Sequence, residues 1–82
     1  MRCRIAISEK AREQLSALPK EMRRNIWERM ETMRDDLRGD VLKLRDKGNR
    51  YRLRIGTFRV LFVLAGDMIQ VYAVKDRKEA YE

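Results

Sequence analysis

Arginine is the residue type best able to do chemistry in this sequence, and its spacing is regular in one segment. Arg50, Arg52 and Arg54 alternate with apolar residues, and Arg59 follows five residues later. Guanidinium groups are planar donors that hold phosphate through paired hydrogen bonds. Residues 50–64 contain four arginines and no acidic residue. The segment therefore predicts a binding site for a phosphate-bearing anion.

The composition limits what else the protein can do. The 82 residues include no histidine and one cysteine, Cys3, which excludes histidine metal sites, Ser-His or Cys-His nucleophiles and an internal disulfide. Any catalysis must therefore use cations and tyrosine, and we expect neither a metal ion nor a cofactor. Cys3 is expected to be a small buried hydrophobe. Trp27 lies off the main apolar stripe of its helix and is a candidate for a partner surface.

The charge is strongly positive and unevenly distributed. The formal net charge is +7 and the isoelectric point is about 10.1. Residues 41–64 hold seven of the basic residues and one of the acidic residues, so the positive field lies in that segment and predicts an anionic partner. Met1 is followed by Arg2 rather than by an apolar signal segment, and no apolar run reaches the roughly 18 residues of a membrane span. We therefore expect a cytoplasmic protein with no membrane role.

The hydrophobic pattern predicts the elements that position the arginines. Arg4–Ser8 alternates as a short strand, and Ser8 can cap a helix that starts at residue 9. Apolar spacings of three and four predict two helices joined near Pro19, which make a helical hairpin over residues 9–38 that stops at Gly39.

After the hairpin the period changes to two. We expect a short apolar piece at residues 41–44 and then strands at 50–55, 58–64 and 68–74, with two-residue turns at 56–57 and 66–67. The chain is expected to form one domain over residues 1–82, in the α+β class, with the order β-α-α-β-β-β. The antiparallel sheet would be covered on one face by the N-terminal helical hairpin.

The turn at residues 56–57 fixes a register for the two strands beside it. The predicted pairs are Tyr51 with Phe62, Arg52 with Leu61, Leu53 with Val60, Arg54 with Arg59 and Ile55 with Phe58. The turn at residues 66–67 similarly predicts Val71 beside Phe62, Tyr72 beside Leu61 and Ala73 beside Val60. The arginines then occupy the face without helices. Directly opposed like charges destabilise a sheet by a few tenths of a kcal/mol up to about 1 kcal/mol, so a compensating role is expected.

Two interpretations of these residues stay open on spacing alone. The arginines can be the solvated face of an amphipathic strand, because exposed charge also protects sheet edges. Tyr81 can be an ordinary aromatic anchor near the C-terminus. Against the first interpretation, a face selected for solubility usually mixes charges of both signs.

The element order and several motifs resemble the RelE/ParE superfamily of bacterial and archaeal toxins, and the RelE-type mRNA interferases in particular. The motifs are the Ile-x-Ile-Ser opening and the segments 15–19, 38–41, 51–55, 58–62 and 76–81. Together they cover nearly the whole chain. The resemblance implies a toxin of a type II toxin–antitoxin system with a cognate antitoxin as partner.

The resemblance also implies a site. RelE-type sites use two basic residues on the second strand, an arginine on the third, an arginine after the last strand and a tyrosine near the C-terminus. The matching residues here are Arg52, Arg54, Arg59, Arg77 and Tyr81. The nearby cations expected to contact RNA are Lys43, Lys47, Arg50, Lys75 and Lys78. The strand-two pair is lysine in the best-known members, and the histidine and glutamate of some branches have no counterpart.

Three functions are consistent with this resemblance. The first is a ribosome-dependent endoribonuclease that cuts mRNA in the decoding site by attack of a ribose 2′-hydroxyl on the adjacent phosphate. In that case Tyr81 acts as the base, and Arg59 and Arg77 stabilise the phosphorane. The second is a ParE-type inhibitor of DNA gyrase, without nuclease activity. The third is an inactive relative or a basic RNA-binding module.

Overall fold

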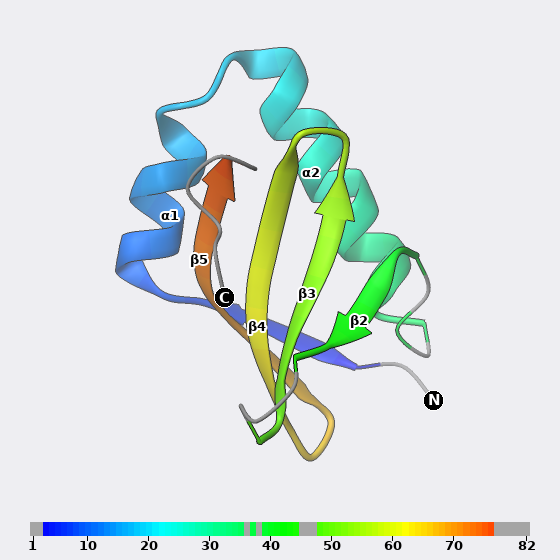
Figure 1. Ribbon diagram of the computed structural model, residues 1–82. Helices are drawn as coiled ribbons and strands as arrows, with labels where there is room; N and C mark the ends of the chain where they lie inside the picture. Colours follow the sequence, from blue (N-terminus) through cyan, green and yellow to red (C-terminus); the bar gives the residue numbers. More distant parts are fainter. Residues whose placement is uncertain (1–2, 36, 38, 45–47, 77–82) are drawn as a thin grey trace.

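In the described part of the chain, two helices cover one face of a five-stranded sheet (Figure 1). The computed structural model describes residues 3–35, 37, 39–44 and 48–76. The helices are α1 (Glu9–Ser16) and α2 (Lys20–Met33), and the strands are β1 (Arg4–Ile7), β2 (Val41–Lys43), β3 (Arg50–Ile55), β4 (Phe58–Ala65) and β5 (Met68–Asp76). This architecture confirms the predicted α+β class and the helical hairpin on one face.

The helices begin where the sequence predicts. Ser8 caps α1, since its hydroxyl oxygen accepts a hydrogen bond from the backbone N–H of Ala11 at 3.1 Å. Pro19 is the residue before α2. The apolar stripe of α2 faces the sheet, and Ile26, Met30 and Met33 are fully buried.

The second helix ends at Met33, earlier than the predicted stop at Gly39. The helix ends in a tighter turn with 3₁₀-type hydrogen bonds, in which the N–H of one residue donates to the carbonyl three residues earlier. The N–H of Arg34 donates in this way to the carbonyl of Glu31. The Arg34 side chain then donates from Nε to the carbonyl of Cys3 at 2.9 Å. This contact ties the helix end to the start of β1.

The sheet differs from the prediction in two respects. Its strand order is β1-β5-β4-β3-β2, and β1 runs parallel to β5, whereas the other neighbours are antiparallel. The alternating pattern of a strand does not encode the direction of its neighbour, so a purely antiparallel sheet was the wrong expectation. The order β-α-α-β-β-β also counts one strand too few, because residues 41–43 pair with β3 as a separate strand.

The register between β3 and β4 is the predicted one for all five pairs. Between β4 and β5, Phe62 faces Val71 as predicted, but Leu61 faces Ala73, not Tyr72, and Val60 faces Val74. A β-bulge between Leu61 and Phe62 causes the shift, because it inserts one extra residue into β5.

The main core lies between the helices and the sheet. It includes Ile26 and Met30 of α2 and Leu53, Val60 and Phe62 of the sheet, each at most 1% exposed. Leu61 and Ala73 are also buried, although they point to the face opposite the helices. Among the described residues, no helix is long and apolar enough to cross a membrane.

Candidate phosphate-binding face

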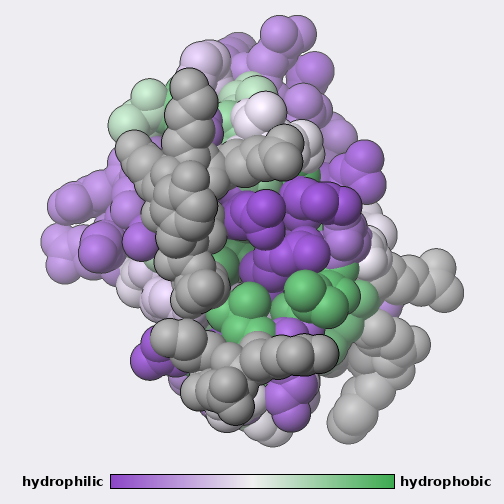
Figure 2. All heavy atoms as spheres, in the orientation of Figure 1, coloured by the Kyte–Doolittle hydropathy of each residue, from purple (hydrophilic) through white to green (hydrophobic). Residues whose placement is uncertain are grey.

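Three cations form a row across the sheet. Arg54 on β3 faces Arg59 on β4, which in turn faces Lys75 on β5. Their strand neighbours Leu53 and Val60 belong to the core, so the three side chains project from the face without helices. Figure 2 shows hydrophilic side chains gathered over the middle of this face. We call Arg54, Arg59 and Lys75 the cationic row.

Two further arginines extend the row along β3. Arg52 faces the buried Leu61, and the Arg52 side chain is only 12% exposed. The guanidinium carbon of Arg50 lies 5.5 Å from the centre of the Tyr72 ring, within range of a cation–π contact. Arginine stems commonly cover apolar surface in this way. The face therefore combines an apolar floor with a layer of guanidinium groups.

Asp40 joins two of these arginines. Its Oδ2 accepts a hydrogen bond from Nε of Arg54 at 2.7 Å, and its Oδ1 accepts one from Nη1 of Arg52 at 3.5 Å. The hydrogen bond from Arg54 holds the pKa of the Asp40 carboxyl below its usual value of 3.8, and the charges of both guanidinium groups act in the same direction. The carboxylate is therefore ionised at neutral pH. Sequence reasoning missed Asp40, although it directly precedes the strand that pairs with residues 51–53.

Arg59 of the cationic row has a buried side-chain donor. Its Nε is buried, and within the described residues this atom has no hydrogen-bond partner. An unpaired buried donor costs about 1–3 kcal/mol, and such groups are rare enough in folded proteins to require an explanation. A donor of this kind on a cationic face fits a role in binding an anion.

The structure brings together half of the predicted site residues. Arg50, Arg52, Arg54, Arg59 and Lys75 share the face without helices. Lys43 does not join them, because it pairs with Tyr51, whose side chain packs against the core on the opposite face. Lys47, Arg77, Lys78 and Tyr81 lie outside the described residues. Tyr72 was not among the predicted site residues, but its ring contacts Arg50. The bulge that moves Tyr72 out of its predicted pairing with Leu61 could not be predicted from the sequence.

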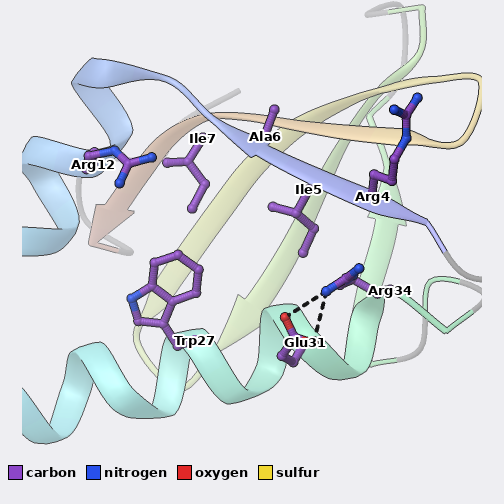
Figure 3. Close-up of a pocket in the computed structure, with 8 residues that line it drawn as sticks. All are labelled: Arg4, Ile5, Ala6, Ile7, Arg12, Trp27, Glu31 and Arg34. Atoms are coloured by element: carbon purple, nitrogen blue, oxygen red, sulfur yellow. Dashed lines mark hydrogen bonds and ion pairs between the residues drawn. The ribbon is translucent and has the colours of Figure 1, made fainter.

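A second surface lies between β1 and α2 (Figure 3). A pocket of about 520 Å³ is lined by Ile5, Ile7 and Trp27, with Arg12 at its edge. An adjoining pocket of about 560 Å³ shares Arg12 and Trp27 and continues along the helices to Leu15. Trp27 is 41% exposed, which is unusual for a tryptophan. We call this surface the Trp27 groove.

Several solved structures have the same fold. A RelB–RelE antitoxin–toxin complex from Methanococcus jannaschii contains a chain that is 25% identical, with 92% of this chain and 93% of that chain covered and a TM-score of 0.78. A RelE–RelB complex from Pyrococcus horikoshii OT3 gives 27% identity, coverages of 98% and 100%, and a TM-score of 0.78. The toxin–antitoxin complex RelBE2 from Mycobacterium tuberculosis, at 18% identity, coverages of 94% and 100%, and a TM-score of 0.77, supports the fold alone. No protein-family model and no curated protein matches the sequence.

Proposed function

Because the chain belongs to the RelE superfamily, we propose that it is the toxin of a toxin–antitoxin system and that it cleaves messenger RNA on the ribosome. The similar chains come from complexes of RelE with RelB, which supports a cognate antitoxin as the partner. Nothing in these matches supports the alternative of a ParE-type gyrase inhibitor. The site of action would be the cytoplasm, where translating ribosomes are found.

The cationic row is the observation that carries this proposal. Arg54, Arg59 and Lys75 are opposed in register, and opposed like charges weaken a sheet. A phosphate backbone would offset that repulsion, because it places several negative charges against the cations and releases counterions. Arg52 adds a further charge on the same face. Five positive side chains on the face without helices suit RNA better than a small neutral ligand.

The proposed reaction uses these charges to stabilise a phosphorane. The ribose 2′-oxygen attacks the adjacent phosphorus, the bond from phosphorus to the 5′-oxygen breaks, and a 2′,3′-cyclic phosphate forms. Arg54 and Arg59 bind the phosphoryl oxygens as negative charge develops on them. Arginine keeps its proton at all relevant pH values, so these residues supply charge and not a proton.

The proton transfers are assigned from the family resemblance. By that resemblance Tyr81 would accept the proton of the 2′-hydroxyl and Arg77 would add positive charge; cations beside a tyrosine favour its phenolate form. The 5′-oxygen takes its proton from water or from ribosomal RNA. The ribosome also aligns the mRNA, which accounts for a reaction that needs no histidine.

The antitoxin would bind at the Trp27 groove. The groove combines an apolar floor at Ile5, Ile7 and Trp27 with arginines at its rim. An acidic amphipathic segment matches both properties, because its apolar side chains fill the groove and its carboxylates face the arginines.

Two assays in parallel test the function. Purified protein is added to ribosomes translating a defined mRNA, and cleavage is mapped by primer extension; we expect cuts within the codon in the decoding site. The same preparation is tested for inhibition of supercoiling by purified gyrase, where we expect no effect. Intact mRNA together with inhibited gyrase would reverse the assignment.

A further inference from the structure

One carboxylate is shared by two guanidinium groups at the edge of the cationic row. Asp40 accepts from Nε of Arg54 at 2.7 Å, while Nη1 of Arg52 lies 3.5 Å from Oδ1 and 3.3 Å from the backbone carbonyl of Asp40. Arg52 and Arg54 are two residues apart on one strand, so their side chains leave the same face and repel each other. The shared carboxylate offsets that repulsion and fixes the positions of both groups.

Among the described residues, the side-chain hydrogen bonds of these arginines involve one nitrogen each. Arg54 donates from Nε and Arg52 from Nη1, and the Arg54 side chain is half exposed whereas that of Arg52 is mostly buried. A guanidinium group has five N–H donors in a rigid fork, so binding along one edge leaves another edge for phosphate. Asp40 therefore orients the two groups without using up their capacity to bind an anion.

The backbone holds Asp40 in place. Its carbonyl oxygen accepts a hydrogen bond from the backbone N–H of Arg54 at 3.0 Å. The preceding Gly39 has a φ of +120°, and a Cβ built on Gly39 would lie 3.1 Å from Cδ1 of Leu53. The chain thus needs glycine immediately before the acid in order to bring the carboxylate to β3. The Asp40 side chain stays 46% exposed, so its negative charge faces the same solvent as the cationic row.

From this geometry we infer that Asp40 is a positioning residue that fixes Arg52 and Arg54 for reaction with phosphate and, in doing so, lowers the affinity for RNA. The inference rests on the proposed function. The two effects have opposite signs, because fixed guanidinium groups favour the transition state, whereas the nearby carboxylate repels every RNA phosphate. If Asp40 only stabilised the fold, its substitution would not tighten RNA binding while slowing cleavage.

The test compares Asp40→Asn with the wild type. Binding of a labelled single-stranded RNA is measured by fluorescence anisotropy over a range of salt concentrations. We expect Asp40→Asn to bind RNA about threefold more tightly at low salt, because it removes one negative charge that repels the RNA phosphates through screening solvent. Single-turnover cleavage on ribosomes should become about tenfold slower, because misplaced catalytic groups lose rate steeply. Asp67→Asn is the matched control, since Asp67 makes an exposed ion pair of the same kind with Arg4 at 3.1 Å.

A second variant separates position from charge. Asp40→Glu keeps the negative charge but moves the carboxylate by one methylene group, so we expect slower cleavage with unchanged RNA affinity. Faster cleavage by Asp40→Asn together with tighter binding would mean that Asp40 only blocks the site, which would overturn the inference. Unchanged cleavage in both variants would overturn it too.

A measurement without ribosomes keeps the inference separate from the proposed function. In a ¹H–¹⁵N spectrum, the Nε–H signal of Arg54 should exchange slowly with solvent in the wild type and rapidly in Asp40→Asn. If the wild type cuts no mRNA but this difference is found, the proposed ribonuclease function fails and the positioning role of Asp40 stands. Equal exchange in the two proteins would show that Asp40 does not hold Arg54.

Discussion

Arg59 of β4 and Lys75 of β5 are directly opposed in the sheet, although both side chains are positively charged. The pair is unfavourable for folding, because cross-strand like charges repel, and Arg59 also buries an Nε that has no hydrogen-bond partner in the described part of the chain. Activity and stability should therefore respond in opposite directions when one of these charges is removed.

The first prediction concerns Arg59. Arg59→Gln should lower ribosome-dependent cleavage by at least about tenfold, because one donor to the phosphorane is lost. The free energy of unfolding should rise by a few tenths of a kcal/mol up to about 1 kcal/mol, because the repulsion with Arg54 and Lys75 is relieved. Urea denaturation and primer extension measure the two effects. Arg29→Gln, on the exposed face of α2, should leave cleavage unchanged; a loss of stability in Arg59→Gln would contradict the prediction.

The second prediction concerns the salt dependence of RNA binding. Each phosphate contact with single-stranded RNA contributes about 0.7 to the slope of log affinity against log salt. Lys75→Ala and Arg54→Ala should each reduce the slope by about that amount, whatever the RNA sequence. Anisotropy titrations at four salt concentrations provide the slopes. Lys10 is an exposed residue of α1, so Lys10→Ala removes the same charge from another part of the surface and should leave the slope unaltered.

The third prediction concerns Trp27. Trp27→Ala should weaken antitoxin binding by about 2 kcal/mol or more, as expected for a tryptophan that lines a groove at the centre of an interface. The stability of the toxin should change little, since the side chain is 41% exposed. Isothermal titration calorimetry and thermal denaturation measure these quantities. Leu42→Ala removes another large hydrophobic side chain, which is 52% exposed, and should weaken the complex less. Equal losses for the two variants would argue against the Trp27 groove.

The fourth prediction concerns the pKa of Asp40. Because the folded pKa lies below the usual value of 3.8, ionised Asp40 stabilises the fold above that pH, and the contribution is lost as pH falls through the folded pKa. The stability difference between the wild type and Asp40→Asn should thus be constant from pH 5 to 7, a range well above both values, and shrink in more acidic solution. Carboxyl ¹³C titration should place the midpoint below 3.8, and Arg54→Ala should raise it. A midpoint insensitive to Arg54→Ala would contradict this.

The fifth prediction concerns the turn before Asp40. Gly39→Ala should destabilise the protein by about 1–3 kcal/mol, since a φ of +120° is strained for alanine and the new methyl group would press on Leu53. Gly48→Ala is the matched control: its φ is +65°, nothing lies within 4 Å of the added atom, and its cost should be nearer 1 kcal/mol. Chemical denaturation of both variants decides whether the contact with Leu53 matters.

The strands that carry the arginines could be predicted from the sequence, because the alternation of apolar and charged residues and the position of the two-residue turn indicate the same pairing. Alternation puts Leu53 and Arg54 on opposite faces, and the two-residue turn at 56–57 fixes the pairing of Arg54 with Arg59. The bulge that displaces Tyr72 was not predictable, because one extra residue leaves no mark in the hydrophobic pattern. The contact of Asp40 with β3 depends on the pairing of the short β2 strand, whose three residues are too few to specify a register.

The parallel pairing of β1 with β5 has a consequence for how the protein is made. Ile7 pairs with Val71, so the first strand cannot take its place until β5 has been synthesised. Contacts of such long sequence separation slow folding, since the intervening loop must close first. A nascent chain would therefore stay incomplete while attached to the ribosome that produces it. A toxin of the proposed kind would in this way complete its sheet only after β5 has emerged.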